Sequence, residues 1–377
     1  MDYFKKSLEL HEILKGKIDF NSKVKIDSRE LLSTAYSPGV AEPCREIAKD
    51  PENAYKYTIK GNTVAVISDG SAVLGLGNIG GLAGLPVMEG KCVLFKEFAG
   101  VNAFPIVLDT QDTEEIIATI RHISPTVGGI NLEDISAPRC FEIEERLKAE
   151  LNIPVFHDDQ HGTAIVALAG LINSLKVVGK NKDEIKIVVN GLGAAGTAII
   201  KLFRLYGVGD IVVCDSKGII SKNRSDLNKE KIEILNITNK NDISGTLKDA
   251  MIGADVFVGV SAPLVVSKEM VSSMKKDSII FAMANPTPEI MPEDAIEAGA
   301  KIVATGRSDY PNQLNNVLVF PGLFKGALEN RVIKITDEHK IQAALALSSY
   351  VKNPTFDEII PSPLDKNIAN IIASVIK

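Results

Sequence analysis

Two pairs of adjacent acidic residues have the types and spacing that divalent-metal chemistry requires. Glu133-Asp134 follows a small, glycine-rich apolar run, and Asp158-Asp159 follows a short strand predicted at Val155–His157. Mg²⁺ and Mn²⁺ prefer several oxygen ligands at one place, so carboxylates at strand ends suit such an ion. One pair alone is explained better by helix capping or a solvated surface. Two pairs, each at a strand end, favour a metal site.

A zinc site is the alternative for the second pair, because His157 and His161 are spaced like the histidines of a zinc protease helix. That motif needs a glutamate base at the second position, inside a helix. Here the second position is Asp158, and Gly162 follows the second histidine at once. Since the next helix is expected to begin only at Thr163, the pattern argues against a zinc hydrolase.

The glycine pattern GxGxxG occurs twice, and the surrounding sequence separates the two copies. Gly75–Gly80 is followed by further glycines and Pro86, a poor start for a helix, so we expect a flexible turn near a site. Residues 191–196 follow a β-branched strand and precede a proline-free helical segment. Phosphate groups bind where a helix N-terminus presents free N–H groups. The predicted residues of a dinucleotide cradle are Gly191, Gly193, Ala194, Ala195 and Gly196.

A carboxylate further along the chain supports this assignment. Asp215 ends the next predicted strand, 19 residues after Gly196, where an acidic residue meets the ribose 2′-hydroxyl of NAD. Lys217, Lys222 and Arg224 follow shortly and could neutralise the 2′-phosphate of NADP. The choice between NAD and NADP therefore stays open.

Bringing these residues together requires several strand ends at one edge, and the sequence has the pattern of a parallel α/β protein. The predicted strands are 63–68, 106–109, 155–157, 185–190, 211–214, 256–260, 279–284 and 301–304. We predict an N-terminal α/β domain for substrate and metal over residues 1–160. Residues 161–377 are predicted to form a Rossmann-like, doubly wound parallel-sheet domain with C-terminal helices. A buried helix over 163–177 should join the halves, the polar stretch 221–241 should be a surface excursion, and 369–376 should form a closing helix.

Composition narrows the class of protein. The 42 basic and 48 acidic residues give a net charge of −6, which argues against a nucleic-acid or anionic-membrane partner. Four scattered cysteines without a Cys-x-x-Cys pair indicate reduced thiols. The N-terminus lacks a signal-peptide core, and the longest apolar run, Ala164–Ile172, is half of a membrane span. A soluble, cytoplasmic protein is expected.

The segment Phe156–Ile172 resembles the signature of malic enzymes throughout its length, and other family-like blocks appear in the family's order. These blocks are Tyr36–Ala41, Ser68–Gly70, Leu74–Asn78, Met88–Lys91, Gly129–Asp134, Ala284–Thr287 and Asn315–Gly322. Several unrelated motifs in one order, from residue 36 to about 325, make the resemblance specific. The length is similar to that of the short prokaryotic form, which has no fused C-terminal acyltransferase-like domain.

The resemblance implies that malate and NAD(P)⁺ are converted to pyruvate, CO₂ and NAD(P)H with Mg²⁺ or Mn²⁺, in a homodimer. Matching positions give each site residue a role. The implied metal ligands are Glu133, Asp134 and Asp159, with Asp158 beside them. The implied general base is Lys91, and the implied general acid is Tyr36. Asn285 and Asn316 are implied to bind the substrate near the nicotinamide.

Both proton-transfer residues also have ordinary explanations, since most lysines are solvated and a tyrosine before Ser-Pro-Gly commonly packs a turn. Lys91 can act as a base only if its pKa falls well below the roughly 10.4 of free lysine. One position departs from the family: Ala72 stands where many larger members carry an arginine for a malate carboxylate. Either Arg307 or a residue of a partner subunit is expected to hold that carboxylate, or malate is expected to bind more weakly.

Two other functions compete with this prediction. A 2-hydroxy acid dehydrogenase that does not decarboxylate would need no metal. A non-catalytic NAD(P)-binding sensor, from a different functional class, would need none of the catalytic residues, and their presence as a set argues against it.

Overall fold

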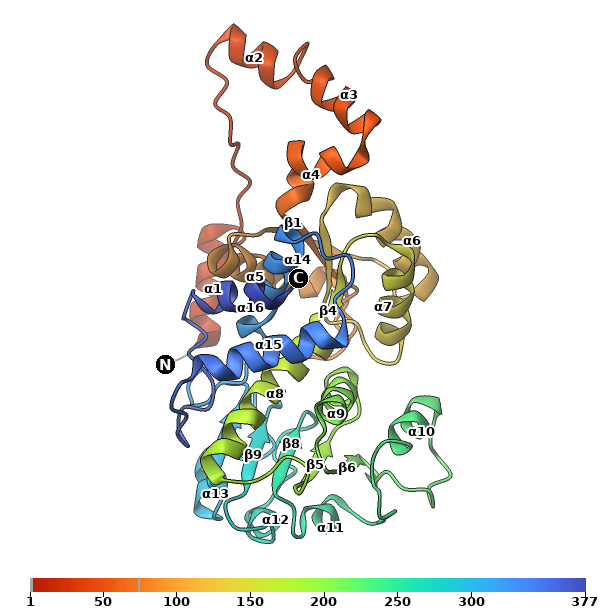
Figure 1. The fold of residues 1–377 in the computed structure, drawn as a ribbon, viewed down its shortest axis with the longest axis vertical. Coiled ribbons are helices and arrows are strands. Elements are labelled where there is room, and N and C mark those ends of the chain that lie inside the picture. Colours follow the sequence, from red (N-terminus) through yellow and green to blue (C-terminus); the bar gives the residue numbers. More distant parts are fainter. Residues whose placement is uncertain (1–2, 74) are drawn as a thin grey trace.

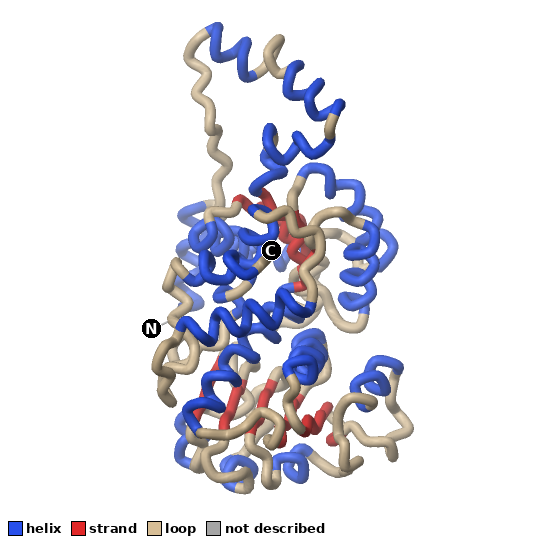
Figure 2. The backbone as a smooth tube through the Cα atoms, in the orientation of Figure 1, coloured by secondary structure: helices blue, strands red, loops and turns tan. Residues whose placement is uncertain are grey.

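The computed structural model describes residues 3–73 and 75–377 and contains two separate β-sheets (Figure 2). Leu74, which opens one of the family-like blocks, lies outside the described residues. The first sheet has the order β2-β1-β3-β4, with all strands parallel. Its strands are β1 (Thr63–Ser68), β2 (Asn102–Val107), β3 (Gly129–Leu132) and β4 (Val155–His157).

Helices cover both faces of this first sheet, as the alternation along β1 requires. Val64 and Val66 face α5 (Gly81–Ala99), whereas Ala65 and Ile67 face α6 (Thr113–Ile123) and α7 (Arg139–Glu150). Because both faces are buried, the strands are continuous apolar runs.

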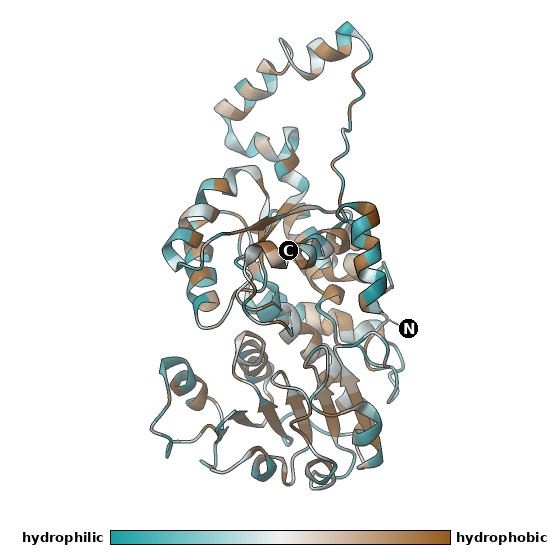
Figure 3. Ribbon diagram, turned by 180° about the vertical axis from the view of Figure 1, so that it is seen from behind, coloured by the Kyte–Doolittle hydropathy of each residue, from teal (hydrophilic) through white to brown (hydrophobic). Residues whose placement is uncertain are grey.

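The second sheet has the order β10-β9-β8-β5-β6-β7, with only β7 antiparallel. Its strands are β5 (Lys186–Asn190), β6 (Asp210–Asp215), β7 (Gly218–Ile219), β8 (Val256–Gly259), β9 (Ile279–Ala282) and β10 (Ile302–Thr305). The chain moves outward from β5 in one direction and then returns to β8 on its other side. The gap between β5 and β8 is therefore the topological switch point at which doubly wound sheets bind ligands. Figure 3 shows these strands as the apolar centre of this half.

Helices flank this sheet as well. α9 (Ala194–Tyr206) covers one face, and α11 (Leu247–Met251), α12 (Lys268–Ser272) and α13 (Pro292–Glu297) cover the other. The predicted α/β class and the Rossmann-like second half are confirmed.

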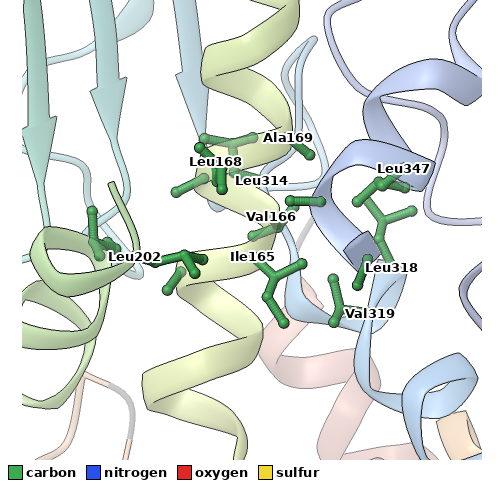
Figure 4. Packing of buried hydrophobic residues seen from close by; sticks show 14 of the residues in the cluster. Ile165, Val166, Leu168, Ala169, Leu202, Leu314, Leu318, Val319 and Leu347 are labelled. Atoms are coloured by element: carbon green, nitrogen blue, oxygen red, sulfur yellow. The ribbon is translucent and has the colours of Figure 1, made fainter. Parts of the chain in front are cut away.

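One long helix, α8 (Asp158–Val178), runs through the centre of the molecule between α9 and α15 (Asp337–Tyr350) (Figure 4). Its length and composition would allow it to cross a membrane, but 72% of its most apolar window is buried inside the protein. It is a core helix. The predicted domain division at 160/161 falls within its first turn and stays a prediction.

The expected start of this helix at Thr163 is wrong, because α8 begins five residues earlier. Two acidic residues in its first turn favour that start through the helix dipole. Gly162 does not end the helix; it permits close packing, since a Cβ there would collide with the Asp158 carboxylate and lie 3.1 Å from Asn316 Cβ.

The C-terminal part of the chain returns to the first half. After η4 (Asn316–Leu318), α14 (Phe320–Glu329) and α16 (Ile368–Val375) pack against each other and against α5. The rings of Phe320 and Phe324 lie 4.8 and 5.5 Å from that of Phe95 on α5. The predicted closing helix over 369–376 is confirmed as α16.

The N-terminal arm, residues 20–58, extends away from the body formed by the two sheets (Figure 1). α1 (Tyr3–Leu14) precedes it, and α2 (Arg29–Ala35), α3 (Ala41–Lys49), η1 (Pro51–Asn53) and α4 (Ala54–Tyr57) belong to it; η2 (Ile59–Asn62) leads into β1. None of the described residues in these helices is buried.

Three further differences from the predictions have local causes. β2 lies at 102–107 rather than 106–109 because Pro105, which cannot donate a ladder hydrogen bond, is tolerated on an edge strand. α5 begins immediately after the first glycine pattern, at Gly81, where a Cβ would come within 2.6 Å of the Leu108 carbonyl oxygen. The surface stretch 221–241 contains α10 (Lys229–Leu235), and β3 and β7 were not predicted as strands.

Candidate active site

Lys91 projects from the middle of α5 into a group of carboxylates and is only 7% exposed. Its Nζ lies 2.5 Å from Asp158 Oδ2 and 2.7 Å from Glu133 Oε1. The same ammonium lies 4.2 Å from the centroid of the Phe320 ring on α14. A buried lysine paired with two carboxylates belongs to an organised site and is not a solvated surface charge.

The acidic cluster, defined as Glu133, Asp134, Asp158 and Asp159, lies at the carboxyl ends of β3 and β4. These two strands are neighbours in the first sheet, so the segments that follow them meet. The Asp134 N–H donates to Asp159 Oδ2 at 2.8 Å and joins the two segments. The structure thus brings together the predicted base and all three predicted metal ligands.

Burial and mutual repulsion keep protons on this cluster. Burial, followed by the charges of Asp159 and Glu133, raises the pKa of Asp134 to about 9. Burial likewise raises the pKa of Asp158 to about 7 and that of Asp159 to about 6, although the Lys91 ammonium opposes both shifts. When all four carboxylates are ionised, the cluster holds more negative charge than the Lys91 ammonium compensates.

The pKa of Lys91 shifts in the direction opposite to that expected from its role as a base. Burial lowers this pKa, but Asp158, Glu133 and Asp159 outweigh burial and hold it above its ordinary value. With the cluster uncompensated, Lys91 is an ammonium ion. A base at this position requires that other positive charge first offset the carboxylates.

The donor chemistry of the cluster fits Mg²⁺ or Mn²⁺. Asp134 Oδ2 and Asp158 Oδ1 are buried and have no hydrogen-bond partner among the described residues. Hard carboxylate oxygens in excess are what these ions prefer. Across residues 3–73 and 75–377, however, no three acidic, histidine or cysteine side chains are placed to hold an ion as they stand. The Lys91 ammonium bonds two of these carboxylates, so an ion would displace at least one of its bonds.

The two predicted substrate asparagines come from the second half of the chain, Asn316 beside the acidic cluster and Asn285 beside the first glycine pattern. Asn316, in η4, lies beside the first turn of α8, since a Cβ on Gly162 would come within 3.1 Å of Asn316 Cβ. Asn285 follows β9, and its amide packs against Gly306 so closely that a Cβ there would collide with it. A Cβ on Gly75 would lie 3.0 Å from the Asn285 carbonyl oxygen. The first glycine pattern is therefore beside a predicted site residue, as expected.

The second glycine pattern has the geometry of a phosphate cradle at the switch point. Gly191 has φ +112°, and a Cβ on it would lie 2.5 Å from the Val260 carbonyl oxygen. A Cβ on Gly196 would collide with the Gly191 carbonyl oxygen. Gly193, in contrast, meets no described atom within 4 Å, so its open side can admit a ligand. α9 starts at Ala194 without a side-chain cap, which leaves N–H groups free for a pyrophosphate.

Asp215 lies beside this cradle but is already bonded. The Gly191 N–H donates at 2.9 Å to the carbonyl of Cys214, the residue before Asp215. The Asp215 carboxylate accepts bonds of 2.7 and 3.0 Å from Arg224 and of 2.6 Å from Lys231. Burial raises its pKa, but these two partners outweigh burial and lower it to about 2.

The cations near Asp215 were only partly identified from the sequence. Arg224 was predicted, whereas Lys231 was missed because it comes seven residues later on α10. Lys217 pairs with Asp226 at 2.8 Å. Lys222 donates its backbone N–H to Asp242.

Tyr36, the predicted acid, is not brought to this site within one chain. It is 69% exposed and follows α2 on the N-terminal arm, away from α5 and α8 (Figure 1). No signal in the sequence indicated that the segment would project from the body.

Ala72, which stands where many larger family members carry an arginine, has the guanidinium of Arg139 nearby, and the sequence analysis did not identify this residue. Ala72 donates its N–H to the Asp134 carbonyl at 2.9 Å, beside the cluster. Arg139 Nη2 donates to Asp69 Oδ2 at 2.7 Å and to Ser71 Oγ at 3.0 Å in the same segment. Arg307, the predicted replacement, forms two bonds to Asp309, of 2.8 and 2.6 Å, beside the loop after β9.

Comparison with known proteins agrees with this geometry. The chain matches the family models "Malic enzyme, N-terminal domain" over residues 15–148 and "Malic enzyme, NAD binding domain" over residues 160–376. It is 58% identical to the bifunctional malic/malolactic enzyme of Bacillus subtilis, over 100% of this chain and 92% of that protein. It is 49% identical to the NADP-dependent malic enzyme of Halomonas elongata, over 92% of this chain and 85% of that protein.

A solved structure has the same fold. The NAD-dependent malic enzyme of Thermotoga maritima superimposes with a TM-score of 0.95, at 50% identity, over 98% of each chain. The fold is therefore shared over nearly the whole length of both chains. The chain belongs to the malic enzyme family and is an oxidoreductase that oxidatively decarboxylates malate while reducing NAD(P)⁺.

Proposed function

We propose that malate reacts at the acidic cluster, with Glu133, Asp134 and Asp159 holding Mg²⁺ or Mn²⁺ and Lys91 acting as the general base. The observation that carries this proposal is the placement of Lys91 Nζ within 2.7 Å of both Glu133 and Asp158. When bound, the ion would supply Lewis-acid stabilisation of negative charge on the substrate oxygens.

The chain's own residues supply positioning and proton transfer. Lys91 accepts the proton of the malate hydroxyl once the surrounding carboxylates are charge-compensated, since only then does its pKa fall toward neutrality. Asp158, which accepts a bond of 2.5 Å from Lys91 Nζ, fixes the direction of the ammonium. The open side of Gly193 and the start of α9 orient the cofactor so that its nicotinamide receives the hydride.

The proposed acid, Tyr36, would serve the site of a second copy in a homodimer. Helices as short as α2 and α3 are marginal without packing, and the arm exposes Leu31, Leu32 and Val40 as well as Tyr36. Contiguous exposed apolar residues of this kind mark an interface. An arm that packs on a partner would bury these residues and deliver the phenol to the partner's enolate.

Mixing two inactive variants tests this arrangement. Tyr36→Phe and Lys91→Met chains, co-expressed, would form mixed dimers in which one site contains both wild-type residues. Random pairing predicts recovery of about a quarter of wild-type activity. If Tyr36 acts within its own chain, co-expression recovers nothing.

The chemical proposal is tested by following reduced cofactor with L-malate and Mn²⁺, first with NAD⁺ and then with NADP⁺. We expect pyruvate and CO₂ in equal amounts, and loss of turnover in EDTA. Full activity in EDTA, or oxaloacetate as the final product, would favour the non-decarboxylating dehydrogenase. Absence of turnover with every 2-hydroxy acid would favour the non-catalytic sensor.

A second candidate activity comes from the name of the Bacillus subtilis relative, "Bifunctional malic/malolactic enzyme". The same site would then reduce pyruvate to lactate with the NADH formed in the first step. Lactate that accumulates from malate at catalytic amounts of NAD⁺ would establish it. We further propose a cytoplasmic location, because Cys44, Cys92, Cys140 and Cys214 are all free thiols.

A further inference from the structure

The first turn of α8 carries two residues of the acidic cluster but lacks the usual side-chain caps. Its N-cap residue, His157, makes no side-chain capping bond. In a capping box the residue at the third helical position accepts a bond from the N-cap N–H. That position is Gln160, whose Nε2 is buried without a partner among the described residues.

A carboxylate from another helix takes this role. Glu144, on α7, accepts the backbone N–H of His157 at 3.0 Å through Oε1. Its second oxygen lies 2.8 Å from His161 Nε2. Because a carboxylate can only accept, the imidazole donates from Nε2. One side chain thus bonds the residues immediately before and after the segment Asp158–Gln160.

Glu144 is strongly held in this position. It is 5% exposed, and Lys148, one turn later on α7, lies 2.6 Å from Oε1. Burial raises the pKa of Glu144, but His161 and Lys148 outweigh burial and keep it ionised. A buried, charged acceptor gives stronger and more directional bonds than a neutral one.

We propose that Glu144 is a positioning residue that fixes the first turn of α8, and with it the directions of the Asp158 and Asp159 carboxylates. The proposal rests on the proposed roles of these two carboxylates. Loss of Glu144 would leave the His157 N–H buried and unpaired and would let the turn move relative to β3, which carries the other half of the cluster. Groups that orient metal ligands commonly contribute about 10- to 100-fold in metal affinity or activity.

The test compares Glu144→Leu, which removes both bonds, with Glu144→Gln. The amide of Gln can still accept the His157 N–H and can donate to His161 in its other tautomer, so it should restore most of the loss. Glu145→Leu is the matched control: Glu145 is next to Glu144 on the same helix and makes no hydrogen bond or ion pair with described residues. The double variant Glu144→Leu/Lys148→Met removes the unpaired ammonium if the single variant fails to fold.

Mn²⁺ binding without substrate, followed by electron paramagnetic resonance, is the first measurement, and amide exchange of His157 is the second. We expect Glu144→Leu to weaken Mn²⁺ binding by about tenfold or more, to speed exchange at His157 and to lower kcat. The KM for cofactor should not change, because the cradle lies on the other sheet.

The outcomes separate this proposal from the proposed function. A folded Glu144→Leu variant with wild-type Mn²⁺ affinity and kcat overturns the positioning role, as does an equal loss in Glu145→Leu. If Glu144→Gln does not restore Mn²⁺ binding, the negative charge of Glu144 is what matters, and the hydrogen-bonding argument is overturned. A wild-type protein that binds no Mn²⁺ overturns the metal site itself, whatever the variants do.

Discussion

Replacing Lys91 with methionine separates the structural and chemical roles of the buried ammonium. Methionine nearly preserves the side-chain volume, so packing against the Phe320 ring on α14 should survive. What is lost is the positive charge 2.5 and 2.7 Å from two buried carboxylates. Removing one partner of a buried ion pair costs about 3–5 kcal/mol because the remaining charge is uncompensated.

This cost has a measurable signature in thermal unfolding. At about 2–4 °C for each kcal/mol in a domain of this size, the variant should melt roughly 6–20 °C below the wild type in EDTA. Saturating Mn²⁺ adds about 2.7 kcal/mol at a hundred times its Kd. The ion should stabilise the variant more than the wild type, because it meets carboxylates that no ammonium neutralises.

Turnover gives the second readout for the same variant. Loss of a general base lowers kcat by about 10²–10⁴-fold, whereas cofactor binding, measured by fluorescence, should persist. Lys96→Met is the control, since Lys96 lies on the exposed face of α5. A Lys91→Met protein that melts with the wild type in EDTA would refute the electrostatic argument, and near-normal turnover would refute the base assignment.

Three other predictions follow from the site. In EDTA the melting temperature should fall as pH rises from about 6.5 to 9. Over that range Asp158 and Asp134, with pKa values raised to about 7 and about 9, lose protons that the folded state binds more tightly than the unfolded state. Mn²⁺ should flatten this dependence, and a melting temperature that rises with pH would contradict the argument. Gly196→Ala should destabilise the protein because its Cβ meets the turn, whereas Gly193→Ala should raise the cofactor KM with little change in melting temperature; equal melting temperatures for the two would refute this contrast. Arg224→Ala should free the carboxylate at the end of β6 for a ribose hydroxyl and shift the kcat/KM ratio toward NAD⁺ by about tenfold or more; an unchanged ratio would remove this residue from the cofactor site.

The local pattern of the sequence was sufficient for the strand–turn–helix arrangement that we propose as the cofactor cradle. The strand, the glycines and the proline-free helix are contiguous, so periodicity and backbone geometry determine their arrangement. Both acidic pairs were expected at strand ends, although only the strand before Asp158-Asp159 was among the predicted strands. That they form one cluster depends on β3 and β4 being neighbours, which is a property of the sheet order and has no signal in either segment.

The missed features are those that join distant segments. Lys231 reaches Asp215 from a different helix, and Glu144 completes a cap thirteen residues away in sequence. The raised pKa of Lys91 arises from three carboxylates on two segments. The helix start was misjudged because Gly162 was taken as a breaker, whereas it is the residue that lets Asp158 fit.

The return of α14 to α5 has a consequence for synthesis of the protein. The ring of Phe320 lies against both Phe95 and the ammonium of Lys91, so the first half is incomplete until residues beyond 320 have left the ribosome. At roughly 5–20 residues per second, the hydrophobic face of α5 waits about 10–45 s for its cover. During that interval the nascent chain exposes the apolar face of α5, and this face is the part of the molecule on which a chaperone would act.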